Sequence, residues 1–308
     1  MSRSASTAQL KATLIGATAI LMWATLALLT VLSGPVPPFQ LTAMAFALAF
    51  LIGLALWLKK GQPILVQLKL PMPVWLTGIG GLFGYHFFYF IALKNAPAVE
   101  ASLIAYLWPL LIVLFSALLP GEKLRWFHLA GGLVSFVGAG LLVTKGQSLN
   151  FEIQYGWGYL AALVCALTWS TYSVLSRRFG ATPTDAVGGF CGVTALLALG
   201  CHLLFEQTVW PVGTEWLAIL GLGLGPVGAA FFTWDYGVKK GNIKILGALS
   251  YAAPLLSTLL LIVVGQAEAS WLVGLACLLI VGGAVLAAGD FLKGSEKERR
   301  FSDSKAQL

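Results

Sequence analysis

The chain has 308 residues, of which 58% are hydrophobic and only 10% charged, and its mean hydropathy is +0.87. Soluble proteins carry about 25% charged residues, so this composition excludes most soluble enzyme classes and indicates a protein that spans a bilayer. The net charge of +7 does not indicate nucleic-acid binding, because the basic residues form no continuous patch. The four cysteines lie in apolar runs without CxxC spacing, so we expect no disulfide framework, no metal and no cofactor.

Apolar segments long enough to cross a membrane follow one another along the chain. A spanning helix needs about 20 mostly apolar residues, and turn-forming stretches such as Gly34-Pro35-Val36-Pro37-Pro38 separate the segments. The first run is too long for a signal-peptide core and lacks a small-x-small cleavage site, so we expect it to remain as a span. We predict ten spans, at 12–33, 39–58, 73–93, 98–119, 127–145, 157–176, 186–205, 215–237, 244–264 and 270–291.

The basic residues predict the direction of these spans, because cytoplasmic loops retain Lys and Arg. With a cytoplasmic N-terminus, 17 of the 19 Lys and Arg residues fall in inner segments, and only Lys94 and Lys145 fall in outer ones. A wrong number of spans would shift the alternation and remove this bias. We therefore predict that both ends, 1–11 and 293–308, are cytoplasmic, and that 293–308 is a disordered tail.

The second half of the chain repeats the first at an offset of about 145 residues. Tyr106-Leu-Trp-Pro109-Leu-Leu matches Tyr251-Ala-Ala-Pro254-Leu-Leu, and Trp23-Ala-Thr25 matches Trp169-Ser-Thr171. Each copy holds five spans, an odd number, so the copies at 12–146 and 157–292 must lie in the membrane with opposite orientation. Inverted repeats are typical of transporters, whose two halves exchange conformations around a site near the bilayer midplane.

Pro109 and Pro254 fall near the middle of the fourth and ninth spans, where proline removes a backbone donor and clashes with the preceding turn. Freed carbonyls are tolerated at membrane depth where they line protein or a watery cavity. Either proline alone could be an ordinary kink. As a matched pair in two repeats, they favour a binding site between the halves.

The segment Gly225–Asn242, which reads GPVGAAFFTWDYGVKKGN, and the following GALSYAAPLL resemble the YddG-type aromatic amino acid exporters, within the EamA-type drug/metabolite transporter superfamily. The resemblance covers nearly the whole chain. It implies an all-α integral membrane protein with ten transmembrane helices in two inverted five-helix repeats. It further implies a place in the bacterial inner membrane and export of aromatic and some other neutral amino acids.

A carrier for an aromatic zwitterion needs an apolar, aromatic chamber with a few polar groups. Tyr and Trp suit this role because they stack on aromatic rings and also offer hydroxyl and N–H groups. We expect the chamber to be lined by Tyr85, His86, Tyr89, Ser102, Tyr106, Trp108, Pro109, Trp169, Tyr251 and Pro254, with Trp23, Tyr172 and Trp234 as further candidates. Helix packing is the alternative role for each of them.

Seven other tryptophans lie near span ends, where Trp gathers at the membrane interface. We expect interfacial positions for Trp57, Trp75, Trp126, Trp157, Trp210, Trp216 and Trp271.

Ionisable residues inside a membrane are functional candidates. His86 lies well inside the third span, although a neutral histidine bonded to a neighbour is the alternative. Asp235 lies near the cytoplasmic end of the eighth span, one turn from Lys239, so we expect an ion pair or a gate contact there. No Asp or Glu falls at the centre of a predicted span, so we expect facilitated transport, with His86 as the alternative proton carrier.

The leading hypothesis is a monomeric amino acid exporter that works by alternating access, with the lipid bilayer and a small-molecule substrate as its only expected partners. The alternative is an exporter of drugs or cationic metabolites that could be proton-coupled, and the missing midplane carboxylate counts against it. An enzyme is not expected, because three scattered histidines do not form a catalytic cluster.

Overall fold

The computed structural model describes residues 3–61, 63–265 and 268–287, and regular secondary structure within these ranges is helical. The predicted tail at 293–308 lies outside the described residues. The helices are α1 (Arg3–Ala24), α2 (Leu26–Leu32), α3 (Pro38–Lys59), α4 (Ile64–Gln67), α5 (Met72–Ile79), η1 (Gly80–Gly84), α6 (Tyr85–Asn95), α7 (Ala98–Ala105), α8 (Trp108–Ser116), α9 (Trp126–Thr144), η2 (Ile153–Tyr155), α10 (Gly156–Arg178), α11 (Ala186–Phe205), α12 (Glu215–Leu224), η3 (Gly225–Ala229), α13 (Ala230–Lys240), α14 (Ile243–Leu249), α15 (Ala252–Val263) and α16 (Trp271–Ala287).

Within the described ranges, nine helical segments are long and apolar enough to cross a membrane. They are Thr7–Leu32, Pro38–Lys59, Met72–Asn95, Ala98–Ser116, Trp126–Thr144, Ile153–Arg178, Ala186–Phe205, Glu215–Lys240 and Ile243–Val263. Their bounds agree closely with those of the first nine predicted spans, because the helices of the structure and the apolar runs of the sequence both end at Gly, Pro or charged residues. The tenth predicted span, 270–291, coincides with the shorter apolar helix α16, and its last residues lie beyond the described part of the chain. The number ten stays a prediction.

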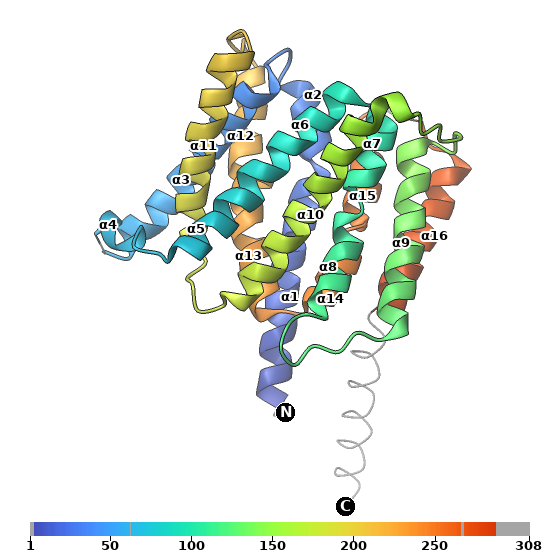
Figure 1. Ribbon diagram of the computed structural model, residues 1–308, viewed down its shortest axis with the longest axis horizontal. Helices are drawn as coiled ribbons and strands as arrows, with labels where there is room; N and C mark the ends of the chain where they lie inside the picture. Colours follow the sequence, from blue (N-terminus) through green and yellow to red (C-terminus); the bar gives the residue numbers. More distant parts are fainter. Residues whose placement is uncertain (1–2, 62, 266–267, 288–308) are drawn as a thin grey trace, which may run out of the picture.

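The two halves of the bundle run in opposite directions. In Figure 1, α1 begins at the lower end, whereas α10, which opens the second half, begins at the upper end. Helices of one half pack on helices of the other, α1 on α13, α3 on α11, α6 on α10, α8 on α14 and α9 on α16. A β-carbon on Gly16 would lie 2.8 Å from the Cα atom of Gly237, so glycine permits the close approach of α1 and α13.

Corresponding helices of the two halves are interrupted at matching positions. The third span contains the π-helical turn η1, and the eighth contains the π-helical turn η3. The fourth span breaks between α7 and α8, and the ninth breaks between α14 and α15. Pro109 and Pro254 follow these breaks directly, because proline cannot donate to the preceding turn. The predicted interruptions of the fourth and ninth spans are therefore confirmed.

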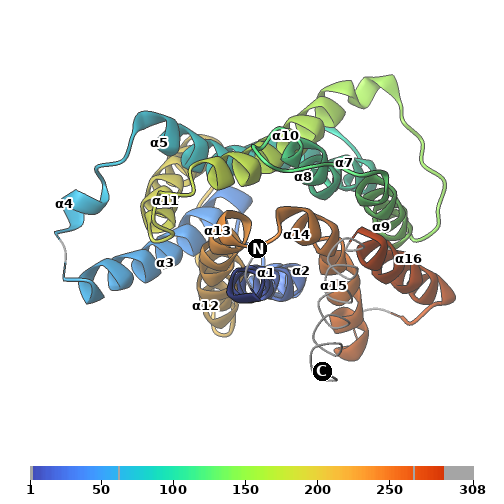
Figure 2. The same cartoon turned by 90° about the horizontal axis from the view of Figure 1, so that it is seen from below.

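The view along the bundle shows α1 between two outer groups of helices, one with α3, α5 and α11 and the other with α9, α15 and α16 (Figure 2). The largest buried apolar cluster lies around α1 and includes Phe46, Trp108, Trp169 and Trp234. Side chains on α1, α8, α10 and α13 can therefore meet in the interior, where the candidate site is found.

Five of the seven tryptophans near span ends are exposed, whereas Trp75 is half-buried against Phe190 and Trp57 is buried. Trp126, Trp157, Trp210 and Trp271 are between 72% and 79% exposed, as expected for residues at a membrane interface. For Trp57 the prediction was wrong, because this residue is fully buried and its indole donates a hydrogen bond of 3.1 Å to a main-chain carbonyl. Trp57 fastens the end of α3 to the start of α11 instead of facing lipid.

Candidate functional site

Four tryptophans from four helices meet near the centre of the molecule. They are Trp23 of α1, Trp108 of α8, Trp169 of α10 and Trp234 of α13, so each half of the chain contributes two. The distances between their ring centroids range from 5.1 to 6.3 Å, at which aromatic rings attract one another. This group, the tryptophan cluster, joins the two halves through aromatic contacts.

The indole N–H groups of the tryptophan cluster are of two kinds. The indole N–H group of Trp23 donates to a main-chain carbonyl of η3 at 3.0 Å. The indole N–H group of Trp234 donates to a serine hydroxyl of α10 at 3.1 Å. Those of Trp108 and Trp169 make no hydrogen bond to any described residue, although only 7% and 3% of these residues is exposed. Neither indole nitrogen is among the fully buried polar atoms that lack a partner, so each N–H group borders accessible space and can donate to a bound molecule.

Polar side chains of α6 and α7 form a wall beside the tryptophan cluster. The rings of Tyr85 and Tyr89 are stacked with centroids 6.1 Å apart, and the ring of Tyr85 lies 5.5 Å from that of Trp169. The Tyr89 hydroxyl and the Ser102 hydroxyl lie 3.2 Å apart and share a hydrogen bond. Tyr85, Tyr89 and Ser102 are half-buried, so this wall borders accessible space next to the cluster.

His86 stands in the same wall as a neutral, hydrogen-bonded residue. Its Nδ1 lies 2.8 Å from the carbonyl oxygen of Leu82, and because a carbonyl can only accept, Nδ1 carries the proton. The ring packs edge-on against Phe46 and Tyr85, with centroids 5.2 and 5.4 Å apart. Nε2 makes no hydrogen bond to another described residue, so it remains an acceptor for a ligand.

Two phenylalanines that the sequence analysis did not select complete this region. Phe46 and Phe231 are stacked with centroids 5.5 Å apart at an interplanar angle of 14°, and Phe231 lies 5.6 Å from Trp169. Phe231 could have been found from the internal repeat, because it occupies the position in the second half that His86 occupies in the first. No pattern in the sequence distinguished Phe46 from the other apolar residues of α3.

Tyr106 and Tyr251 occupy equivalent positions in the two halves but have different surroundings. Tyr106 lies in the interruption before α8, is half-buried, and its hydroxyl makes no hydrogen bond to a described residue. It lies near enough to Tyr85 and Tyr89 for their hydroxyls to interact electrostatically. Tyr251 is fully buried, and its hydroxyl accepts a hydrogen bond of 3.2 Å from the backbone N–H of Leu110.

The structure therefore does not bring every predicted lining residue together. Tyr251 lies in a separate apolar cluster with Leu110 and Ile280, between helices of the outer group. Pro254 stands in the first turn of α15, next to this separate cluster, whereas Pro109 stands in the first turn of α8 and directly follows Trp108 of the tryptophan cluster. Identical Tyr-x-x-Pro elements thus have unlike environments in the two halves.

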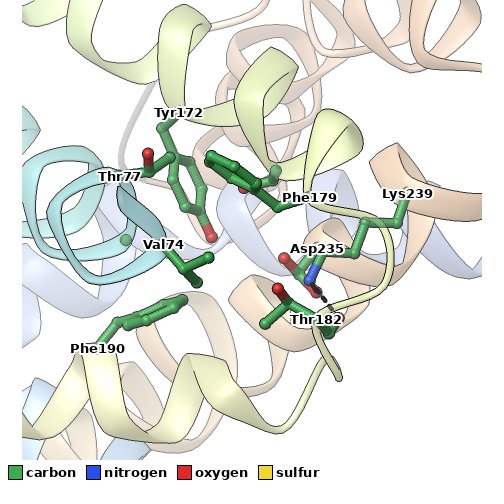
Figure 3. Close-up of a pocket in the computed structure, with 10 residues that line it drawn as sticks. Val74, Thr77, Tyr172, Phe179, Thr182, Phe190, Asp235 and Lys239 are labelled. Atoms are coloured by element: carbon green, nitrogen blue, oxygen red, sulfur yellow. Dashed lines mark hydrogen bonds and ion pairs between the residues drawn. The ribbon is translucent and has the colours of Figure 1, made fainter. Parts of the chain in front are cut away.

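Asp235 and Lys239 form a buried ion pair near the lower end of α13. The Nζ atom of Lys239 lies 2.8 Å from Oδ2 of Asp235, and the two side chains are 5% and 1% exposed. Nζ also donates to the carbonyl oxygen of Thr182 at 3.0 Å, which ties α13 to the loop after α10 (Figure 3). A space of about 10 Å³, enough for about one water molecule, adjoins the pair. Tyr172 lines this space and also contacts Trp169, with ring centroids 5.2 Å apart.

A second set of ion pairs at the same end links the two halves directly. Glu122, which follows α8, lies 2.8 Å from Nη2 of Arg177 and 2.9 Å from Nζ of Lys244. Arg177 donates in addition to the carbonyl oxygens of Val238 and Gly241, at 2.9 and 2.7 Å. The ends of α8, α10 and α13 and the start of α14 are thereby held together at what we call the basic end of the bundle.

The charge of Glu122 is stabilised by these partners. Burial by itself would raise the pKa of the carboxyl group, but Lys244 and Arg177 outweigh burial and hold the pKa below its usual value. Glu122 is therefore ionised at neutral pH, and the link between the halves is intact there.

The sequence analysis missed the set of Glu122, Arg177 and Lys244, although a signal was present. Acidic residues are few on the predicted cytoplasmic side, where Lys and Arg abound, so each acidic residue there has basic neighbours to pair with. Asp185 follows the same rule, since it pairs with Lys60 at 2.6 Å.

Among the described residues, no group of three or more His, Cys, Asp or Glu side chains could hold a metal ion.

Comparison with known proteins places these features in a family. The model of the EamA-like transporter family matches residues 10–144 and 156–289. The aromatic amino acid exporter YddG of Ancylobacter novellus is 58% identical over 277 residues, which cover 90% of this chain and 96% of that protein. The exporter of the same name from Escherichia coli strain K12 is 28% identical over 293 residues, which cover 90% of this chain and 96% of that protein.

A solved crystal structure has the same fold as this chain. It is 58% identical in sequence and superposes with a TM-score of 0.86, covering 90% of this chain and 97% of the other. With two family matches that together span most of the chain and with helices suited to cross a bilayer, the protein belongs to the EamA-like transporter family and is a multi-pass protein of the bacterial inner membrane.

Proposed function

We propose that this protein exports aromatic amino acids, and some other neutral amino acids, by alternating access around the tryptophan cluster. The observation that carries the proposal is the tryptophan cluster itself, in which both halves meet and two indole N–H groups have no acceptor among the described residues. The 58% identity to an aromatic amino acid exporter supports the same substrate class. A ring-shaped substrate suits this site, because aromatic rings can stack on its walls.

The polar wall suits the charged ends of an amino acid. The carboxylate of a substrate can accept hydrogen bonds from the N–H groups of Trp108 and Trp169 and from the hydroxyl of Tyr106. The ammonium group can donate to Nε2 of His86 or lie over a ring face, which contributes roughly 0.5–2 kcal/mol. No full counter-charge is needed, and the modest affinity that results allows the substrate to leave.

The basic end acts as the cytoplasmic gate in this proposal. Cytoplasmic loops retain basic residues, and the first turn of α1 and the last described turn of α16 lie at this end (Figure 1). The ion pairs of Glu122 with Arg177 and Lys244 close this end by holding the two halves together, whereas the pair of Asp235 and Lys239 lies within α13 of the second half. Substrate from the cytoplasm can enter only after the ion pairs of Glu122 separate. Because both five-helix halves belong to one chain, a monomer is sufficient for this rearrangement.

We propose facilitated transport driven by the substrate gradient. A second candidate is a proton-coupled exporter of cationic metabolites, and one observation favours it: Asp235 is a carboxylate buried within a spanning helix. Its pairing with Lys239 counts against that role, because a paired carboxylate is less free to bind a proton or a cation.

Transport by the purified protein in liposomes separates the two candidates. Uptake of labelled tryptophan should be inhibited by unlabelled Trp and Phe, more weakly by Thr, and not by a quaternary amine. An imposed pH gradient should leave the rate unchanged. If no amino acid is transported while the quaternary amine is, the substrate class is wrong; if the rate follows the pH gradient, facilitated transport is wrong.

A further inference from the structure

A groove opens on the outer face of the bundle between two helices of opposite halves. It has a volume of about 510 Å³ and lies between the α5–η1–α6 segment and α10. These helices cross in front of the bundle in Figure 1. The recess exists because glycine replaces larger side chains there, and a β-carbon on Gly80 would meet nothing within 4 Å.

The groove lies at the depth of the membrane hydrocarbon. Its lining residues belong to the spanning segments Met72–Asn95 and Ile153–Arg178 and include exposed apolar side chains such as Leu76 and Leu167. Lipid-facing surface at this depth meets hydrocarbon and not water, so the groove is open to the hydrocarbon chains of lipid. The fatty acyl chain is therefore the chemistry that fits its main part.

One charged residue stands where the groove meets the basic end. The groove-lining residues Thr168, Thr171 and Leu175 follow one another at helical spacing on α10, and Arg178 continues the same stripe three residues later. Arg178 is exposed and makes no ion pair or hydrogen bond to the part of the chain that the structure describes. An unpaired guanidinium at the membrane surface suits a phosphate group.

The dimensions of the groove agree with those of one lipid leaflet. From Arg178 back to Thr168 the helix rises about 15 Å, at 1.5 Å per residue, and one leaflet of the hydrocarbon core is also about 15 Å thick. The hydroxyl groups of Thr77 and Thr171 border the groove and make no hydrogen bond to described residues.

We propose that the groove is a specific site for an anionic phospholipid of the cytoplasmic leaflet. The phosphate lies at Arg178 and one acyl chain lies along α10 toward Phe88. The lipid stands beside the cytoplasmic gate, because Thr77 and Tyr172 line both the groove and the pocket next to the buried pair of Asp235 and Lys239 (Figure 3).

Native mass spectrometry of the delipidated, full-length protein tests this site. The probes are palmitoyl-oleoyl phosphatidylglycerol, which is anionic, and phosphatidylcholine with the same two chains. The wild-type protein should retain phosphatidylglycerol in preference to phosphatidylcholine. Arg178→Gln should remove this preference, lowering phosphatidylglycerol affinity about fivefold, as expected for one basic residue near an anionic lipid. Gly80→Leu should fill the groove and lower the retention of both lipids.

Two matched variants serve as controls. Gly274 in α16 is exposed and open in the same way as Gly80, so Gly274→Leu should not change lipid retention. Lys240 is an exposed basic residue of α13 at the same end, so Lys240→Gln should leave the preference intact. The proposal is overturned if wild-type protein shows no preference for phosphatidylglycerol, or if the controls lower retention as much as the groove variants. Should Gly80→Leu fail to fold, Arg178→Gln decides alone.

Discussion

The third helix of the first half and its equivalent in the second half have the same backbone but different side chains. Both contain a π-helical turn built on glycine. After this turn the first half places Tyr85, His86 and Tyr89, whereas the second half places Ala230, Phe231 and Trp234 at the equivalent positions. The polar wall of the site thus comes from the first half and the apolar wall from the second.

The fourth and ninth helices repeat this difference. The hydroxyl of Tyr106 makes no hydrogen bond to a described residue, whereas the hydroxyl of Tyr251 accepts a hydrogen bond from the backbone N–H of Leu110. A symmetric backbone therefore carries an asymmetric arrangement of side chains, in which the first half offers polar groups and the second half offers mainly apolar rings. Substitutions at equivalent positions in the two halves should consequently have unequal effects.

The largest effect is expected from removing an aromatic ring where the two walls meet. Trp169→Ala should lower the free energy of unfolding by about 3–5 kcal/mol, because it deletes a large buried ring, and should reduce transport at least about tenfold. Membrane insertion should persist. The measurements are thermal unfolding in detergent and uptake of labelled tryptophan in liposomes. Trp157→Ala, at a residue that is 79% exposed, is the control and should change neither. Full transport by Trp169→Ala would reduce this tryptophan to a packing residue.

Tyr251→Phe should affect stability more than transport. Without the hydroxyl, the buried N–H group of Leu110 loses its acceptor, at a cost of about 1–3 kcal/mol. The expected result is a lower melting temperature with a normal transport rate per folded molecule. A transport defect without loss of stability would place Tyr251 in the substrate path and contradict the comparison.

Tyr106→Phe, the matched change in the first half, should affect transport more than stability. Its hydroxyl makes no hydrogen bond to a described residue, so thermal unfolding should stay the same. Transport should fall about tenfold, because a hydrogen bond to a charged group contributes about 1.5–3 kcal/mol. The Michaelis constant and maximal rate for tryptophan uptake would show whether binding or translocation is affected. Equal stability losses in both variants would remove the proposed asymmetry.

The fold could be predicted from the sequence because its determinants are local. Apolar length and the positions of proline are properties of short segments, and the bounds of the described helices follow them closely. The exception is instructive: Trp57 lies at a span end like the interfacial tryptophans, but tertiary packing buries it and supplies an acceptor for its indole. Whether a tryptophan at a span end faces lipid or protein is not a local property.

The candidate site could be predicted only in part, for the same reason. The aromatic residues of the centre stand out in the sequence, and the repeat would also have indicated Phe231. The surroundings of Tyr106 and Tyr251 differ because different helices pack against each break. The identical Tyr-x-x-Pro motifs do not predict this difference. The partners of Glu122 are distant in sequence, Arg177 by 55 residues and Lys244 by about 120, so only the fold brings these charges together.

The smallest expected effect concerns the charges that hold the two halves together at the basic end. Glu122→Gln should lower the free energy of unfolding at pH 7 by about 1 kcal/mol or less, because the carboxylate is partly exposed and its ion pairs are screened by solvent. The pKa of Glu122 is lower in the folded protein than its ordinary value. Its contribution is therefore complete above the unfolded pKa, about 4.3, and is lost as the pH falls through the lower folded pKa.

Melting temperatures of wild-type protein and Glu122→Gln measured from pH 7 downward test this expectation. The difference between them should be constant near neutrality and shrink below about pH 4.3. Glu268→Gln, at an exposed residue without an ion pair to a described residue, is the control and should not differ from wild type near neutrality. A difference that persists unchanged into acid would mean that Glu122 acts by shape and not by charge. The two halves would then be joined at this end by packing, as they are at the tryptophan cluster.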